Sequence, residues 1–253
     1  MWELHRPLLE RRGPVWAPDL PGFGLQDPLP PDDRTLEAYA DWIAEGLRRR
    51  FRRPARVAGY SMGGTLALLV ALRHPRAVAA LGLFSTSACW GRGLRRWAGR
   101  AFAGLGRTLA MEAFQLSVRV GFSAYDGDPD RASVVRDMVD RAHRPTMLAL
   151  YRALTGLDLR PRLPEVAPPA VVACGTWDWL APPTHARELA RGLPRAELCI
   201  VPRATHLMCL SHVEAFSAIL QQFLSLNDRG PSGAEDGSGG REPEDSAWRS
   251  ERS

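Results

Sequence analysis

Short apolar runs alternate along this chain with stretches of helical periodicity, and this alternation restricts the fold more than any other feature. The runs at residues 78–84 and 170–174 contain no charged side chain. Between such runs, apolar residues recur at spacings of three and four, as Leu36, Tyr39 and Ile43 do. The pattern is typical of β–α units around a mostly parallel sheet, so the sequence predicts the α/β class.

The alternation also predicts where the individual elements lie. The expected strands are residues 14–18, 56–59, 78–84, 170–174 and 197–201. The expected helices are residues 35–50, 62–73, 183–192 and 212–226, the first with Thr35 as its N-cap.

Two regions depart from the alternation. Residues 88–159 are mostly helical in pattern and rich in arginine, and we expect them to form an insertion that lies over the sheet as a cap. Beyond residue 226, Gly, Ser and charged residues dominate, so too little apolar surface is available to offset the entropy of ordering. We therefore expect one domain over residues 1–226 and a disordered tail over 227–253.

The segment Gly59-Tyr60-Ser61-Met62-Gly63 lies between a predicted strand and a predicted helix. It fits G-x-S-x-G, the nucleophile elbow, in which a serine on a sharp turn projects its hydroxyl above the sheet. Close packing of strand and helix calls for small residues, which Gly59, Gly63 and the following Gly64 supply. The pattern alone occurs by chance in roughly one chain of this length in ten, so the strand-to-helix context decides against an ordinary Gly-Ser turn. Ser61 is the candidate nucleophile, and the amide of Met62 is a candidate oxyanion donor.

A serine hydroxyl near neutral pH needs a base to take its proton and a third group to orient that base. Of the six histidines, only His206 occupies a loop directly after a predicted strand, where its side chain can lean over the strand ends. The others lie near the terminus, at or within helices, or in the insertion; they are His5, His74, His143, His185 and His212.

The candidate acid is Asp178, which follows the predicted strand at 170–174 through Gly175-Thr176-Trp177. Open α/β sheets place their sites at this edge. Asp158 is the alternative, but it precedes that strand, and we expect it to pair locally with arginine. Together with Ser61 and His206, Asp178 would complete a catalytic triad.

On these motifs the chain resembles the α/β-hydrolase superfamily of serine esterases, over residues 2 to about 225. The order serine, aspartate, histidine is the one that α/β-hydrolases use. Within the superfamily, the chain is most similar to the pimeloyl-acyl-carrier-protein methyl ester carboxylesterases of biotin synthesis. The similarity rests on Asp19-Leu20-Pro21-Gly22-Phe23-Gly24, Ser85-Thr86-Ser87-Ala88-Cys89 and Leu157-Asp158-Leu159-Arg160.

The resemblance implies an α/β-hydrolase fold with a helical cap and a serine esterase without metal or organic cofactor. The implied substrate is a medium-chain acyl methyl ester carried on acyl-carrier protein. We expect Ser61, Met62 and His206 to contact it, with an acyl slot lined by Phe114, Leu116 and Val118. An acidic carrier would face the arginines of the insertion, namely Arg92, Arg95, Arg96, Arg100 and Arg107.

One departure from the family concerns the start of the chain. The family places its third strand, and a His-Gly motif that supplies one oxyanion amide, before the region where Met1 begins here. The sequence is thus expected to lack the N-terminal strands, with a true start upstream of Met1. The alternative is a chain that has lost part of its oxyanion hole.

The composition of the chain limits its expected binding partners and its expected cellular compartment. Lys+Arg 33 minus Asp+Glu 28 gives +5, and every cationic residue of that sum is arginine. The arginine-rich residues 92–107 lack an aromatic stacking platform, which argues against nucleic acid. No apolar run is long enough for a bilayer, and residues 1–12 lack the apolar core of a signal peptide. The four cysteines are scattered and form no CxxC pair, so we expect a cytoplasmic protein with reduced cysteines. We also expect a monomer.

Two other functions fit parts of the sequence. A small-ester carboxylesterase or an enol-lactone hydrolase would use the same three side chains equally well. A binding protein that keeps the triad without turnover is the alternative from another class.

Overall fold

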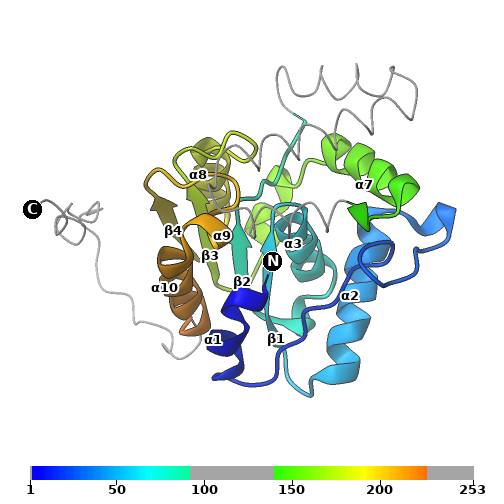
Figure 1. The fold of residues 1–253 in the computed structure, drawn as a ribbon, viewed down its shortest axis with the longest axis horizontal. Coiled ribbons are helices and arrows are strands. Elements are labelled where there is room, and N and C mark those ends of the chain that lie inside the picture. Colours follow the sequence, from blue (N-terminus) through cyan, green and yellow to red (C-terminus); the bar gives the residue numbers. More distant parts are fainter. Residues whose placement is uncertain (1, 92–139, 227–253) are drawn as a thin grey trace, which may run out of the picture.

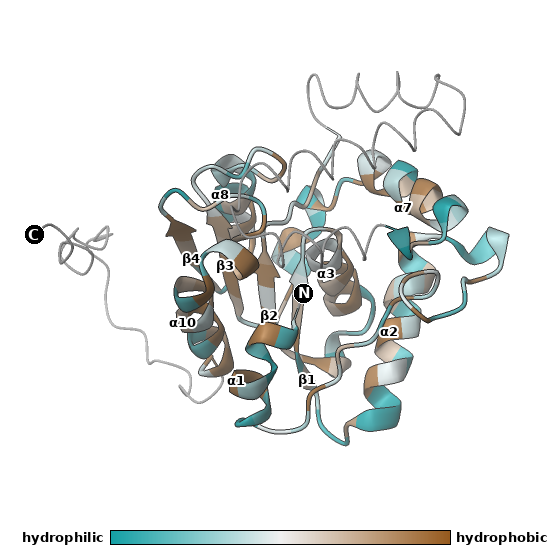
Figure 2. Ribbon diagram, in the orientation of Figure 1, coloured by the Kyte–Doolittle hydropathy of each residue, from teal (hydrophilic) through white to brown (hydrophobic). Residues whose placement is uncertain are grey.

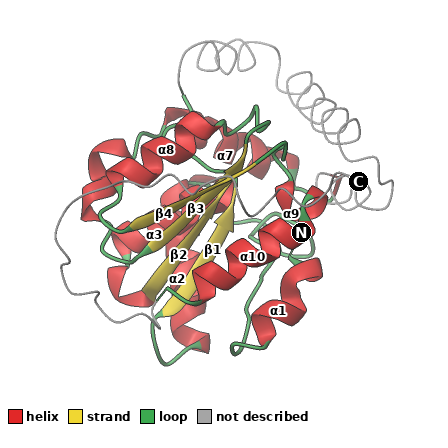
Figure 3. Ribbon diagram, turned by 90° about the vertical axis from the view of Figure 1, so that its left-hand side faces the viewer, coloured by secondary structure: helices red, strands yellow, loops and turns green. Residues whose placement is uncertain are grey.

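The structure, a computed structural model, describes residues 2–91 and 140–226. It has three layers, with a parallel sheet between two layers of helices (Figure 1, Figure 3). Within the described residues the strands lie side by side in chain order, each parallel to the next: β1 (Ala55–Tyr60), β2 (Val78–Phe84), β3 (Ala170–Gly175) and β4 (Ala196–Val201). All four carboxyl ends therefore meet at one edge of the sheet.

Helices cover both faces of this sheet. One face packs against α2 (Leu36–Arg50), α3 (Met62–Arg73) and α8 (Pro183–Gly192). The other packs against α1 (Arg6–Glu10), α9 (Met208–Ser211) and α10 (Val213–Leu224). Helix α7 (Arg144–Gly156) lies beside α2. Short 3-10 turns complete the described elements, namely η1 (Glu3–His5), η2 (Pro31–Asp33), η3 (Pro75–Ala77) and η4 (Arg160–Glu165).

Strand β3 shows why the sheet is buried on both faces. Its residues are all buried, and they alternate between the two core clusters, as successive side chains of a strand must. Val172 and Cys174 pack with α3 and α8, whereas Val171 and Ala173 pack with α10. Figure 2 shows the matching hydrophobic colouring along the strands and hydrophilic colouring on the outer turns of α2.

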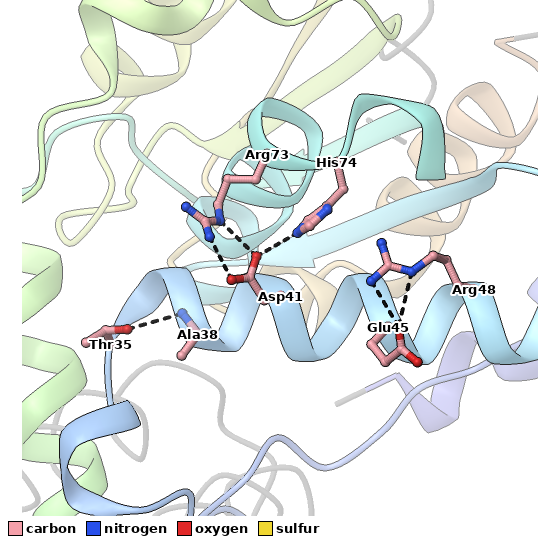
Figure 4. A network of polar contacts seen from close by, with 7 residues as sticks. All are labelled: Thr35, Ala38, Asp41, Glu45, Arg48, Arg73 and His74. Atoms are coloured by element: carbon pink, nitrogen blue, oxygen red, sulfur yellow. Dashed lines mark hydrogen bonds and ion pairs between the residues drawn. The ribbon is translucent and has the colours of Figure 1, made fainter.

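Helices α2 and α3 are also joined by polar contacts at the surface (Figure 4). Thr35 caps α2, since its Oγ1 accepts from the amide of Ala38 at 3.1 Å. Asp41 then accepts from Arg73 at 2.6 Å and lies 2.6 Å from Nε2 of His74. The hydrogen bonds from Arg73 are the main cause that lowers the pKa of Asp41 to about 2.

Most predicted elements are confirmed, with two differences. Residues 14–18 do not form a strand. Trp16 instead packs on α2, with its ring 5.7 Å from that of Trp42 and the guanidinium of Arg50 4.6 Å from its centroid. The predicted closing helix over 212–226 is confirmed as α10. A short helix, α9, precedes it where none was predicted, and His212 between the two leaves the helical conformation (φ −128°, ψ 59°).

The predicted insertion lies partly within the described residues, and the predicted tail lies outside them. Residues 92–139 and 227–253 fall outside them. The two ends of the insertion are adjacent, because Cys89 and Asp158 form a β-bridge and the amide of Leu159 donates to the carbonyl of Ala88 at 2.8 Å. Among the described helices, none has the length and apolar character needed to span a membrane.

Candidate active site

Ser61 stands on a strained turn between β1 and α3. Its backbone has φ 54° and ψ −121°, in a region that residues other than glycine rarely adopt. Contacts to the end of β2 hold this turn: the amide of Ser61 donates to the carbonyl of Phe84 at 2.9 Å, and Thr86 Oγ1 donates to the Ser61 carbonyl at 2.7 Å. The sequence thus folds locally as a nucleophile elbow.

The two glycines of the motif meet different surroundings. A Cβ built on Gly59 would lie 2.0 Å from the carbonyl oxygen of Gly63, so only glycine fits there. A Cβ on Gly63 would meet nothing within 4 Å among the described residues. The expectation that close packing requires glycine is therefore confirmed at Gly59, and the described residues do not impose it at Gly63.

The structure brings Ser61, His206 and Asp178 together at the carboxyl edge of the sheet. They follow β1, β4 and β3 respectively. Nε2 of His206 lies 3.1 Å from Oγ of Ser61, and its Nδ1 lies 2.9 and 3.0 Å from the two carboxyl oxygens of Asp178. The side chains of His206 and Asp178 are only 5% and 0% exposed, so water does not compete for these hydrogen bonds.

Further contacts fix the orientation of the acid and the tautomer of the histidine. Oδ1 of Asp178 accepts from the amides of Leu180 at 3.0 Å and Ala181 at 2.7 Å. An ionised carboxylate accepts only, so Nδ1 of His206 must carry a proton and donate it. Nε2 is then left as an acceptor for the hydroxyl of Ser61, which is the arrangement that a general base requires.

Met62, whose amide is the predicted oxyanion donor, directly follows Ser61. Met62 is the first residue of α3, so its N–H has no partner within the helix. The positive end of the helix dipole adds to its attraction for negative charge. An anion that forms on a carbonyl attacked by Ser61 can therefore be stabilised at this helix terminus.

Sequence reasoning missed Tyr60 and Ser85. The hydroxyl of Tyr60 donates to the carbonyl of His206 at 2.5 Å, and Oγ of Ser85 donates to the Tyr60 hydroxyl at 3.1 Å. Burial raises the pKa of Tyr60 well above its usual value, so this phenol stays a donor. Tyr60 occupies a position that G-x-S-x-G leaves free, so the one available signal was a hydroxyl-bearing ring beside the serine.

The other candidates lie elsewhere. Asp158 pairs with Arg160 through two contacts of 2.7 and 2.5 Å, as expected. His5 contacts Ser217 and the carbonyl of Cys209, and His74 contacts Asp41. The remaining histidines are on or beside helices, with His143 capping α7, His185 in α8 and His212 before α10. The predicted acyl-slot residues Phe114, Leu116 and Val118 lie outside the described residues.

The described residues contain no group of three or more histidine, cysteine, aspartate or glutamate side chains that could hold a metal ion. None of the four cysteines, all of them within the described residues, forms a disulfide, and burial is the main cause that raises the pKa of Cys174 to about 12. The side chains that meet at the carboxyl edge of the sheet are the hydroxyl of Ser61, the imidazole of His206 and the carboxylate of Asp178.

Comparison with known proteins places this geometry in a family. Residues 1–219 match the alpha/beta hydrolase family. A pimeloyl-[acyl-carrier protein] methyl ester esterase of Neisseria meningitidis serogroup C is 31% identical over 233 residues, covering 88% of this chain and 88% of that protein.

Solved structures share the fold. A hydrolase from Pseudomonas aeruginosa is 25% identical with a TM-score of 0.76, over 88% of this chain and 84% of that one. The enol-lactonase from Burkholderia xenovorans is 23% identical with a TM-score of 0.72, over 88% and 85% of the two chains, and shows the fold alone. The predicted fold class and resemblance are confirmed: the chain belongs to the α/β-hydrolase family, as a hydrolase of the serine type.

Proposed function

We propose that this hydrolase cleaves carboxylic esters through an acyl-enzyme formed on Ser61. The observation that carries the proposal is the continuous hydrogen-bonded chain from Ser61 Oγ through His206 to Asp178, with distances of 3.1 and 2.9 Å. Relatives named as esterases support the ester as substrate class. Because the contact with Asp178 fixes which ring nitrogen of His206 carries the hydrogen, the base is oriented before a substrate arrives.

The reaction follows from these groups. Oγ of Ser61 attacks the ester carbonyl carbon while Nε2 of His206 takes its proton, and the amide of Met62 donates to the resulting oxyanion. His206 returns the proton to the leaving alkoxide, so the alcohol departs and the acyl group stays on Ser61. Water then attacks with His206 as base, and collapse releases the acid and restores the serine hydroxyl.

A fluorophosphonate probe tests this function, since it phosphonylates activated serines. We expect labelling of the wild-type chain and none of Ser61→Ala or His206→Ala. Asp158→Asn is the matched control, because Asp158 pairs with Arg160 away from the triad, and its labelling should stay close to wild type. Equal labelling of Ser61→Ala would place the nucleophile elsewhere. A wild-type chain that resists the probe would favour the binding-protein alternative.

We propose further that the substrate is the methyl ester of a pimeloyl group on acyl-carrier protein, in biotin synthesis. Several relatives at about 30% identity carry this activity in their names. The arginines of the insertion, which lie outside the described residues, suit an acidic carrier.

Reversal of two of these arginines separates the carrier-bound substrate from small esters. Arg95→Glu with Arg96→Glu should slow hydrolysis of pimeloyl-carrier methyl ester, most at low salt, and leave p-nitrophenyl acetate nearly unchanged. Equal loss on both substrates would remove the charge argument for the carrier. Turnover of p-nitrophenyl acetate or an enol-lactone without turnover of the carrier-bound ester would favour a small-ester or enol-lactone hydrolase.

A further inference from the structure

Tyr60 connects the nucleophile and the base by a route other than the triad itself. Its backbone precedes Ser61 directly, at the end of β1, and its side chain crosses to the loop after β4. There the hydroxyl donates to the backbone carbonyl of His206, the same residue whose ring faces Ser61 at 3.1 Å. Ser61, Tyr60 and His206 thus form a closed ring of covalent and hydrogen bonds.

This ring limits how the imidazole can move. The carbonyl and the side chain of His206 share one Cα, so fixing the direction of the carbonyl restricts the backbone rotation that would swing the ring away. Nδ1 is held separately by Asp178 at 2.9 Å. The triad contact therefore fixes the imidazole from the side chain, and the Tyr60 contact fixes it from the main chain.

Ser85 makes a second contact with the hydroxyl of Tyr60. It follows β2 with φ 45°, and its amide donates to the carbonyl of Ala173 in β3 at 2.7 Å, which anchors it. Its Oγ donates to the oxygen of Tyr60 at 3.1 Å. A carbonyl oxygen can only accept, so the hydrogen of the Tyr60 hydroxyl points to the carbonyl of His206, and the contact with Ser85 holds the phenol oxygen from a second side.

The surroundings of Tyr60 make this hydrogen bond hard to replace. The residue is 6% exposed, and its ring packs edge-on against Phe216 at 5.9 Å. Ser85 is fully buried. Both sides of the contact are thus enclosed, so water has little access to replace the phenol hydroxyl at the carbonyl of His206.

We propose that Tyr60 is a positioning residue for catalysis, which holds His206 at hydrogen-bonding distance from Ser61 through the His206 carbonyl, with Ser85 holding the phenol oxygen in place. The inference rests on the proposed acyl-enzyme chemistry of Ser61 and is independent of the acyl group or carrier.

The variant Tyr60→Phe tests this role, because it keeps the ring and removes one oxygen. Misplacement of a reacting group by about 1 Å costs on the order of 100-fold in rate, so we expect the fluorophosphonate labelling rate to fall about 10- to 100-fold. For p-nitrophenyl acetate, kcat should fall by a similar factor while KM changes less than about twofold, since the oxygen does not contact substrate. Rates are normalised to the folded fraction measured by near-UV circular dichroism.

Tyr39→Phe is the matched control. Tyr39 is likewise buried, and its hydroxyl donates to the carbonyl of Pro21 at 2.5 Å, a contact that does not involve the triad. The melting temperature should fall by a similar amount in both variants, but Tyr39→Phe should keep the wild-type labelling rate. If Tyr60→Phe also keeps that rate per folded molecule, Tyr60 is structural and the inference is wrong.

Ser85→Ala decides the matter if Tyr60→Phe does not fold. It leaves the contact between Tyr60 and His206 in place but removes the second contact that holds the phenol oxygen, so we expect a smaller fall in labelling, about 3- to 10-fold. A wild-type rate in Ser85→Ala, with Tyr60→Phe unfolded, would overturn the inference. A wild-type chain that resists the probe would instead refute the proposed function, and the two failures are thereby distinguished.

Discussion

Helix α3 has an aspartate–histidine pair near each of its ends, and the two pairs differ in surroundings. At the N-terminal end, beside Ser61, Asp178 lies 2.9 Å from Nδ1 of His206, and the Asp178 side chain is 0% exposed. At the C-terminal end, Asp41 lies 2.6 Å from Nε2 of His74, and its side chain is 43% exposed (Figure 4). By distance alone, the second pair is the tighter one.

The comparison teaches that a short contact does not by itself make a functional pair. Asp41 divides its oxygens between His74 and Arg73, in contact with water, so its ion pairs are screened. Asp178 accepts from two backbone amides and one imidazole, without water, and the imidazole has a hydroxyl beyond it. Burial and the third partner distinguish the catalytic candidate from the surface cluster.

The largest expected difference between the two pairs is in turnover. Asp178→Asn removes the charge and allows the wrong tautomer of His206, so kcat/KM for p-nitrophenyl acetate should fall about 10⁴-fold. Asp41→Asn should leave kcat/KM within about twofold of wild type. Steady-state kinetics on the two variants make the comparison. Full activity in Asp178→Asn would move the acid to another residue, with Asp158 next in order.

At the N-terminal end of α3, the two glycines of the elbow should differ in how well they tolerate substitution. In Gly59→Ala the new methyl group would meet the Gly63 carbonyl at 2.0 Å, and we expect a loss of about 3 kcal/mol in the free energy of unfolding. Gly63→Ala should change it by less than about 1 kcal/mol, because the described surroundings leave room. Urea denaturation measures both. A stable Gly59→Ala variant would show that the elbow relaxes more readily than its geometry indicates.

The contribution of Asp41 to the stability of the fold should depend on pH in the acid range. Asp41 has a folded pKa of about 2, below its usual 3.8, so the folded state favours its ionised form. Its contribution to stability is therefore fully present above about pH 4 and lost as the pH falls from there through 2. Denaturation of wild type and Asp41→Asn across this range should show their difference shrinking as the acid is added. A difference that stays constant with pH would contradict the pKa shift.

The smallest expected effect is the energy of the ion pair between Asp41 and Arg73. Both side chains are more than a third exposed, and exposed pairs contribute about 1 kcal/mol or less. A double-mutant cycle with Asp41→Asn and Arg73→Gln should give a coupling of that size, decreasing in 1 M salt because of screening. A coupling that salt leaves unchanged would show that the cluster is less hydrated than its exposure implies.

The sequence was most informative where function depends on position along the chain. The alternation located α3 and β2 at their observed bounds, and residues at strand ends pointed to Ser61, Asp178 and His206. Such positions can be predicted from the sequence because parallel strands bring their carboxyl ends together, whichever side chains lie between those ends.

Contacts between residues that are far apart in the sequence could not be predicted in the same way. Residues 14–18 have a strand-like composition, but the position of Trp16 depends on Trp42 and on the space above Gly46, which both belong to helix α2. The destination of the Tyr60 side chain depends on a loop 146 residues later. Local propensity carries no information about such partners.

The distance along the chain between Ser61 and His206 has a consequence for folding. The two residues are 145 positions apart, and His206 follows β4, the strand at the far edge of the sheet from β1. A chain whose last strand has not yet docked has an elbow but no base, so it cannot react. Long-range pairing of this kind slows folding. During refolding, the appearance of a labelled serine should therefore report the completion of the sheet, later than any signal from helix formation.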